Sequence, residues 1–292
     1  MPLPRLTQAQ APLTQAIEVL DEHGERRNTA IPAERPLTVF VDKRELLTLM
    51  TLGAAPELLV LGYLRNQRLL ERLDDIESIT VDWDVNAAAV RTVSGLPDLE
   101  ARTAQKVVTT GCGQGTVFGG LMDEIDRIEL PPPAEARISQ RGLYALLEAM
   151  RLQESTYKSS GSVHGCALFA LGRDTQGVQT AELLHFVEDV GRHNAIDTIA
   201  GWMWMQGLDS RGKVFYTTGR LTSEMVIKAA QMGVPIVVSR SGITQMGHAL
   251  AGQLGMTLFG RAVNRHFLCY SGFERFDAEP AAALERRPLP GD

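Results

Sequence analysis

The chain is poor in cysteine and has no excess of positive charge, and each shortage argues against a class of protein. Its 292 residues include 3 cysteines and no CxxC pair, which argues against a secreted disulfide-bonded scaffold. Lys and Arg number 29 against 35 Asp and Glu, so the net charge of −6 gives no support for nucleic-acid binding. The length leaves room for one large or two modest domains.

Long apolar segments are also missing. The start of the chain has no apolar region of the kind that marks a signal peptide. The most apolar stretch, residues 46–64, contains Gly53, Pro56 and Glu57, which a lipid-facing span tolerates poorly. We therefore expect no membrane span and a cytoplasmic protein with free thiols.

The first half of the chain predicts a small α+β domain. Residues 1–33 are polar and contain prolines, and we expect a flexible arm there. The domain then covers residues 34–130, with a proline-opened helix from Pro56 and the loop around Cys112 near its end. Its predicted strands are residues 37–41, 44–49, 76–83 and 88–93.

Beyond the three prolines at 131–133, the pattern changes to an α/β domain over residues 134–272. Its second half alternates strand and helix, which predicts a parallel sheet with helices packed on its faces. The tail, residues 273–292, is predicted to be loose. The predicted helices are 138–153, 192–205, 223–232 and 244–254, and the predicted strands are 163–171, 178–186, 213–217, 235–239, 256–259 and 267–270.

Cys112 lies in the run Thr109-Thr110-Gly111-Cys112-Gly113-Gln114-Gly115-Thr116. Glycines on both sides leave the thiol uncrowded and let backbone N–H groups turn inward as an anion-binding nest, which favours a reactive thiolate. The alternative is a tight turn with an incidental cysteine. Cys166 and Cys269 lie among apolar strand residues, where cysteine is typically a small core residue.

Arginines follow the ends of several predicted strands. Ligands of such sheets bind at the carboxyl ends of the strands, and arginine beside a helix N-terminus holds phosphate. We therefore expect an anionic ligand of nucleotide type, whereas the alternative is that these arginines only solvate the edge of the sheet and pair with carboxylates. The candidate residues are Arg192, Arg220, Arg240 and the loop Arg261, Ala262, Val263, Asn264, Arg265 and His266.

Further polar residues accompany these arginines. Glu188 and Asp189 are candidates to cap the following helix, to orient Arg192 or to accept hydrogen bonds from a base or ribose. His164 is either a half-buried structural histidine or a group beside a reactive sulfur, and His193 is a second candidate for proton transfer.

Three other functions find little support. The run Gly111-x-Gly113 lacks the third glycine of a dinucleotide fingerprint. A zinc deaminase needs a CxxC pair and a histidine–glutamate motif, but Ala195 stands two residues after His193. No serine nucleophile elbow is present.

Several of these motifs, in this order, resemble the formate dehydrogenase accessory sulfurtransferases, the FdhD family of sulfur carriers. The resemblance covers residues 34–271, and the run Glu188–Ala195 is its most specific part. The other matching runs are Glu34–Leu37, Thr110–Gly113, Gly161–His164, Gly219–Arg220, Glu224–Val226 and Lys228–Ala230.

The resemblance implies a sulfur relay. Such proteins take sulfur from a cysteine desulfurase as a cysteine persulfide and pass it to the molybdenum bis-guanine-dinucleotide cofactor before that cofactor enters formate dehydrogenase. Cys112 matches the persulfide cysteine, and 261–266 matches the cofactor-binding loop. The family's fold implies a three-layer core like that of cytidine deaminase but without zinc, a smaller N-terminal α+β domain, and a homodimer.

One departure from the family divides two hypotheses. Many members have a second cysteine three residues after the first, where this chain has Gly115. The first hypothesis is a sulfurtransferase that carries the persulfide on Cys112 alone. The second is a non-catalytic chaperone that binds the molybdenum cofactor without transferring sulfur, and a third is a small-molecule enzyme built on the deaminase-like core.

Overall fold

The structure is a computed structural model that describes residues 3–95 and 125–281. It is a mixed α+β protein with two compact units, each built from separate segments of the chain. The first unit consists of Met1–Arg127, Glu154–Cys166 and Phe186–Asp209, and the second of Ile128–Gln153, Ala167–His185 and Ser210–Asp292. The predicted domains 34–130 and 134–272 are consecutive rather than interleaved, and these limits stay a prediction.

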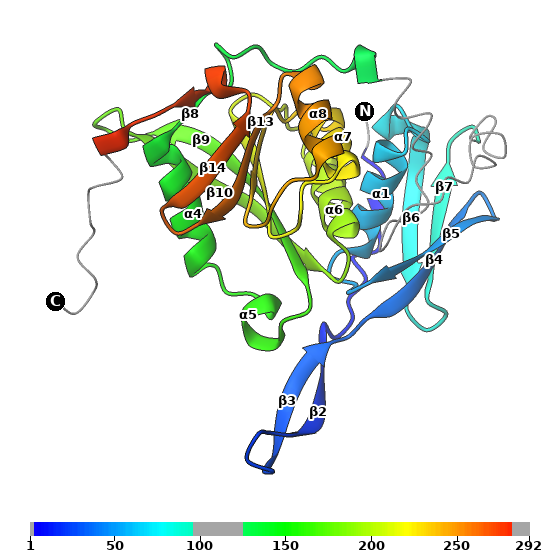
Figure 1. Ribbon diagram of the computed structural model, residues 1–292. Helices are drawn as coiled ribbons and strands as arrows, with labels where there is room; N and C mark the ends of the chain where they lie inside the picture. Colours follow the sequence, from blue (N-terminus) through cyan, green and yellow to red (C-terminus); the bar gives the residue numbers. More distant parts are fainter. Residues whose placement is uncertain (1–2, 96–124, 282–292) are drawn as a thin grey trace. The chain divides into compact units, whose positions relative to one another are not determined.

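A five-stranded sheet forms the centre of the first unit (Figure 1). Apolar residues alternate along β4, so that Leu37, Val39 and Val41 are buried while the residues between them are partly exposed. Helix α1 (Pro56–Asn66) packs on this sheet, with proline in its first turn as predicted. The strands, in sheet order, are β1 (Arg5–Leu6), β6 (Ile76–Asp82), β7 (Ala87–Thr92), β4 (Arg35–Val41) and β5 (Arg44–Thr51).

Two glycines let α1 cross α6 (Arg192–Met205) at very short distance. A Cβ atom on Gly62 would lie 1.7 Å from the carbonyl oxygen of Asp197, and one on Gly201 would lie 2.0 Å from that of Leu58. Asn66 Nδ2 donates a 2.7 Å hydrogen bond to Asp197 within the same contact. This crossing places α6 in the first unit, although the sequence predicts it in the second domain.

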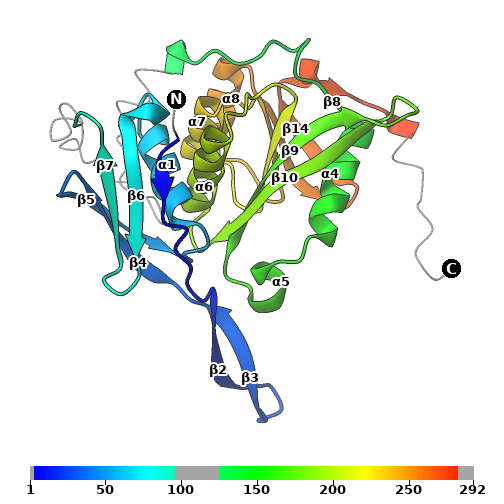
Figure 2. The same cartoon turned by 180° about the vertical axis from the view of Figure 1, so that it is seen from behind.

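The N-terminal segment contains more regular structure than the predicted flexible arm. Strands β2 (Thr14–Leu20) and β3 (Arg26–Pro32) pair along their whole length as an antiparallel hairpin, which projects from the five-stranded sheet (Figure 2). Asp21 Oδ1 accepts hydrogen bonds from the backbone N–H groups of His23 and Glu25 and so fixes the turn. Side-chain bonding of this kind makes a turn without the Asn-Gly pattern that would have predicted it.

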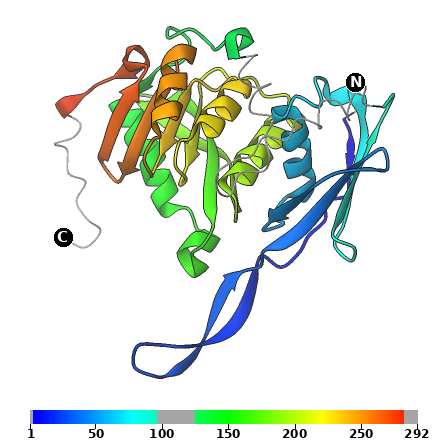
Figure 3. The ribbon, with the colours of Figure 1, turned by 45° about the vertical axis from the view of Figure 1, so that its right-hand side comes forward.

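The second unit is built around a six-stranded sheet, with α4 (Gln140–Leu152) on one face and α7 (Ser223–Gln231) and α8 (Gln245–Leu254) on the other (Figures 1 and 3). Residues 164–166 of β9 and 186–189 of β10 are counted with the first unit. Three neighbouring strands, β11, β12 and β13, run parallel, which confirms the predicted strand–helix alternation. The strands, in sheet order, are β10 (Gln179–Asp189), β9 (His164–Arg173), β11 (Lys213–Thr217), β12 (Ile236–Ser239), β13 (Thr257–Val263) and β14 (His266–Ser271).

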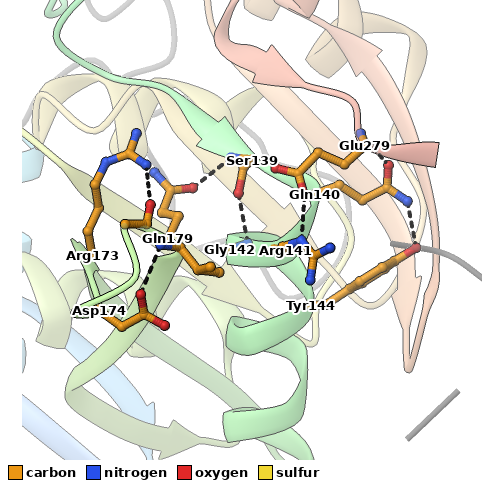
Figure 4. A network of polar contacts seen from close by, with 11 residues as sticks. Ser139, Gln140, Arg141, Gly142, Tyr144, Arg173, Asp174, Gln179 and Glu279 are labelled. Carbon is orange, nitrogen blue, oxygen red and sulfur yellow. Dashed lines mark hydrogen bonds and ion pairs between the residues drawn. The ribbon is translucent and has the colours of Figure 1, made fainter. Parts of the chain in front are cut away.

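A polar network fixes the start of α4 to β10 (Figure 4). Ser139 caps the helix by accepting a 3.1 Å hydrogen bond from Gly142 N, and its own N–H donates to Gln179 Oε1 at 2.6 Å. Gly142 is needed here, because a Cβ atom would lie 2.4 Å from that same Gln179 oxygen.

The segment after β14 is ordered as far as the structure describes it, which differs from the loose tail predicted for 273–292. Strand β15 (Phe276–Asp277) pairs with β8 (Ile138–Ser139), and Arg275 is buried. Glu279 forms a 3.0 Å ion pair with Arg141, which Figure 4 also shows. Strand pairing and ion pairs therefore hold a segment whose composition resembles a tail. No helix among residues 3–95 and 125–281 has the length and apolar character needed to cross a bilayer.

Candidate functional site

Cys112 lies outside the residues that the structure describes, but the other two cysteines are placed. Cys166 is fully buried in β9. Cys269, in β14, is half-buried and its Sγ lies 3.5 Å from the carbonyl oxygen of Ser271, to which the thiol donates. Burial raises the pKa of the Cys269 thiol to about 11, so very little thiolate forms at neutral pH. Both cysteines are therefore poor nucleophiles.

Asp189, in the first unit, is a buried carboxylate whose two oxygens bind two segments that are far apart in the sequence. Oδ2 accepts hydrogen bonds from the Thr51 hydroxyl (2.5 Å) and from Leu52 N (3.1 Å), at the end of β5. Oδ1 accepts from Gly191 N (3.0 Å) and from Asn194 Nδ2 (2.8 Å), at the start of α6. The carboxylate thus anchors the loop after β10.

Burial raises the pKa of Asp189 above the ordinary aspartate value, and the four hydrogen bonds act in the opposite direction. Donors on both oxygens stabilise the charged form, whereas the surrounding protein excludes the water that would otherwise solvate it. Because the raised pKa is the net result, ionisation of Asp189 lowers the stability of the folded state. The four donors hold the carboxylate in place.

Glu188 has a similar anchoring role in the first unit. Its oxygens accept hydrogen bonds from the backbone N–H groups of Thr156 (2.6 Å) and Tyr157 (3.0 Å), which begin the short helix α5 (Thr156–Ser160). The helix predicted for a cap by Glu188 was the one that follows it, α6, whereas the helix that Glu188 caps is α5. Both carboxylates of the signature run thus bind backbone groups of the protein itself.

The remaining candidates of the first unit lie at the ends of its elements. Arg192 and His193 begin α6 and are buried, with 7% and 2% of their surface exposed. His164 begins β9 and is half-buried, after a turn in which Gly161 and Ser162 both have positive φ. The structure therefore gathers these residues on the segments that Glu188 and Asp189 anchor.

In the second unit, buried hydroxyl groups organise the loops that follow β11 and β12. Thr217 and Ser239 are the last residues of these parallel strands and have no exposed surface. Thr217 Oγ1 accepts a hydrogen bond from Gly219 N (3.0 Å), and Ser239 Oγ donates one to Gly219 O (2.7 Å). Ser239 Oγ also accepts from Ser241 N (2.9 Å).

Backbone hydrogen bonds extend this connection to a third strand. Arg240 N donates to Thr217 O (3.0 Å), Leu221 N donates to Gly242 O (3.0 Å), and Arg261 N donates to Ser241 O (2.7 Å). The loops after β11 and β12 and a bulge in β13 are therefore joined at one edge of the sheet. This result agrees with the prediction that the carboxyl ends of these strands lie together.

Three arginines of these joined segments, Arg220, Arg240 and Arg261, have exposed side chains. Among the described residues, no carboxylate lies within ion-pair distance of Arg220 or Arg261. For these two, the structure therefore does not support the alternative that they pair with carboxylates. We call Arg220, Arg240 and Arg261 the arginine edge. Arg220 and Arg240 lie shortly before the N-termini of α7 and α8 in the chain, and exposed arginines near helix N-termini are suited to an anion.

Residues 261–266, predicted to be a loop, are largely strand. β13 continues to Val263, with a bulge at Arg261 (φ +51°) and a turn at Asn264 (φ +56°) into β14. Arg265 lies over the Tyr144 ring, 5.3 Å from its centroid, and His266 is exposed at the start of β14. Of the two remaining residues, Ala262 faces the core and Val263 is exposed.

Four polar residues that organise these sites are absent from the sequence-based candidates: Thr51, Asn194, Thr217 and Ser239. One signal was available, since Thr217 and Ser239 both end apolar strands and precede arginine-containing loops. Thr51 carries no such signal, because its partner Asp189 is 138 residues away.

The model of the FdhD/NarQ family matches residues 32–277 of the chain. The sulfur carrier protein FdhD of Bacillus subtilis is 30% identical over 242 residues, which cover 83% of this chain and 88% of that protein. The sulfur carrier protein FdhD of Listeria monocytogenes is 26% identical, over 85% and 91% of the two chains. A crystal structure from Desulfotalea psychrophila, of a protein assigned as a formate dehydrogenase accessory protein, shares the fold with a TM-score of 0.68 and 24% identity, over 91% of this chain and all of that one.

Proposed function

The chain belongs to the FdhD/NarQ family, and we propose that it is a sulfur carrier that serves a formate dehydrogenase. Cys112 is the proposed carrier. The observation that supports this choice is the state of the other two cysteines, since Cys166 is fully buried and the pKa of Cys269 is raised to about 11. Of the 3 cysteines, Cys112 is then the one left to form a thiolate near neutral pH.

In the proposed first step, the Cys112 thiolate attacks the outer sulfur of a persulfide on a cysteine desulfurase. An S–S bond forms at Cys112, the S–S bond of the donor breaks, and the donor cysteine leaves as a thiolate. In the second step the outer sulfur passes to the molybdenum bis-guanine-dinucleotide, which is the cargo. Cys112 keeps the electron pair of the broken bond and returns to the thiolate, while the acceptor supplies the pair for its new bond to sulfur.

The arginine edge is the proposed holder of the phosphates of that cargo. Its three exposed guanidinium groups fit the forked geometry and negative charge of phosphate oxygens. Arg265 and His266 lie next to the arginine edge in the β13–β14 turn and at the start of β14. In the first unit, Arg192 is proposed to bind phosphate, and His164 and His193 are proposed to assist proton transfer. A core like that of cytidine deaminase, without zinc, and a homodimer complete the proposal.

Mass spectrometry tests the carrier role. Full-length protein is incubated with a cysteine desulfurase and cysteine, and its mass is measured without reduction. We expect one added sulfur on wild-type protein and on Cys269→Ser, and none on Cys112→Ser. An adduct that persists in Cys112→Ser would contradict the choice of cysteine.

A second function is favoured by one observation, Gly115 in place of the second cysteine of many relatives. It is a cofactor-binding chaperone that does not transfer sulfur. Absence of the persulfide adduct together with intact binding of guanosine diphosphate would support the chaperone. Stoichiometric zinc in the purified protein would instead point to an enzyme that uses the deaminase-like core.

A further inference from the structure

Ser239 is a fully buried serine that follows three buried apolar residues at the end of β12. Its hydroxyl uses both of its roles: it donates to Gly219 O at 2.7 Å and accepts from Ser241 N at 2.9 Å. Without this hydroxyl, a carbonyl and an N–H group would lose their partner inside the protein. The Ser239 hydroxyl therefore joins the loop after β11 to the loop after β12.

The two backbone groups that Ser239 binds belong to peptide units next to arginines. The Gly219 carbonyl is part of the peptide that leads into Arg220, and the Ser241 N–H is part of the peptide that follows Arg240. Ser239 thus fixes the backbone on one side of Arg220 and on one side of Arg240. Thr217 fixes the other side of Arg240, because its carbonyl binds Arg240 N, and its hydroxyl binds Gly219 N on the same side of Arg220 as the Ser239 contact.

The third arginine is connected to the same hydroxyl through one residue. Ser241, whose N–H is bound by Ser239, accepts the 2.7 Å hydrogen bond from Arg261 N with its carbonyl oxygen. One buried hydroxyl thus stands at the centre of a hydrogen-bonded chain that reaches the backbone of all three arginines.

We infer that Ser239 is a positioning residue that sets the spacing of the arginine edge for a polyphosphate ligand. This inference rests on the proposed function. Bidentate contacts between guanidinium and phosphate depend on orientation, so the backbone that carries each arginine has to be held before the ligand arrives. Ser239 does not touch the ligand; it acts through Arg220, Arg240 and Arg261.

A matched pair of variants tests this role. Ser271 is also buried and its hydroxyl donates to Met256 O at 2.8 Å, but its partner precedes β13, at the opposite end of that strand from the arginine edge. Ser239→Ala and Ser271→Ala each remove one buried hydroxyl. We expect comparable losses of thermal stability, but an affinity for guanosine diphosphate about tenfold lower in Ser239→Ala and within about twofold of wild type in Ser271→Ala.

Two further measurements separate positioning from general loosening. Ser239→Thr keeps the hydroxyl and is expected to restore affinity to within about threefold of wild type. The ratio of the affinities for guanosine diphosphate and for guanosine is expected to fall in Ser239→Ala, because the phosphate contacts are what the variant disturbs.

The outcomes distinguish this inference from the proposal on which it rests. If wild-type protein binds guanosine diphosphate and Ser239→Ala binds it equally well, or loses both ligands in the same proportion, the positioning role is overturned and the nucleotide site remains. If wild-type protein does not bind the diphosphate, the proposed nucleotide site is overturned and the role of Ser239 falls with it.

Discussion

Arginines lie close to the end of β10, at the start of α6, and also in the loops after β11 and β12, but the neighbouring polar side chains have different roles in the two regions. At the end of β10, the buried carboxylates of Glu188 and Asp189 bind backbone N–H groups. At the ends of β11 and β12, the small hydroxyls of Thr217 and Ser239 bind the backbone of the loops that follow, and the long side chains of Arg220 and Arg240 in those loops are exposed.

This difference indicates which charged side chains of the two regions are available to a ligand. A charged side chain that already has its hydrogen bonds within the protein stabilises the loop, and replacing it acts first on folding. A charged side chain whose loop is held by other groups can contact an anion without loss of structure. The loop after β10 is therefore expected to respond to substitution in stability, and the arginine edge in affinity.

The largest expected effect is that of Asp189→Ala. The substitution leaves four donors without their acceptor in a buried place, namely those of Thr51, Leu52, Gly191 and Asn194. We expect the free energy of unfolding to fall by about 3–5 kcal/mol, as measured by urea denaturation of the full chain.

Asp277→Ala serves as the control for that substitution. Asp277 pairs with Arg137, but its side chain is 46% exposed, so the loss is expected to stay below about 1 kcal/mol. Equal losses at the two positions would remove the distinction between an anchoring carboxylate and a surface one.

The next effect concerns the arginine edge. Arg220→Ala and Arg261→Ala are each expected to weaken binding of guanosine diphosphate about tenfold and to change the free energy of unfolding by no more than about 0.5 kcal/mol. Titration calorimetry and urea denaturation give the two quantities. Arg173→Ala, at another exposed position of the second unit, is the control and should leave the affinity unchanged. A large loss of stability in the edge variants would make the two sets of loops alike.

Local patterns predicted much of the fold. Helix α6 and strand β11 have the predicted bounds, because glycines lie close to both ends of each element. β13 is longer than predicted, since the turn that ends it uses Asn264 at positive φ and no glycine marks the position. The β2–β3 hairpin was not predicted, although its turn has a sequence signal in Asp21 and in Gly24, whose φ is +78°.

The charged residues of the candidate site could be predicted from the sequence, but the buried hydroxyl groups that hold the backbone around them could not. The arginine edge could be predicted because the carboxyl ends of parallel strands lie at the same edge of a sheet, and the strands themselves are recognisable in the sequence. The anchoring of Asp189 by Thr51, and of Gly219 by Ser239, joins residues that are far apart along the chain. Such contacts exist only after packing. The prediction for Cys112 falls outside the described residues and stays a prediction.

The smallest expected effect is a difference in the pH dependence of stability between the two aspartates already compared. Burial raises the pKa of Asp189 above the ordinary value near 4, so its contribution to stability is full below that value and is lost as pH rises through the raised pKa. The hydrogen bond and ion pair with Arg137 lower the pKa of Asp277, so its contribution is present above the ordinary value and is lost as pH falls through the lowered pKa. Relative to wild type, Asp189→Asn and Asp277→Asn should therefore change the slope of unfolding free energy against pH in opposite directions. The Asp189 change belongs above pH 4 and is at most about 1.4 kcal/mol per pH unit. The Asp277 change belongs below pH 4 and is smaller, because solvent screens the charge of a side chain that is 46% exposed. Urea denaturation from pH 7 to pH 3 measures both slopes, and slopes that change in the same direction would show that burial does not dominate at Asp189.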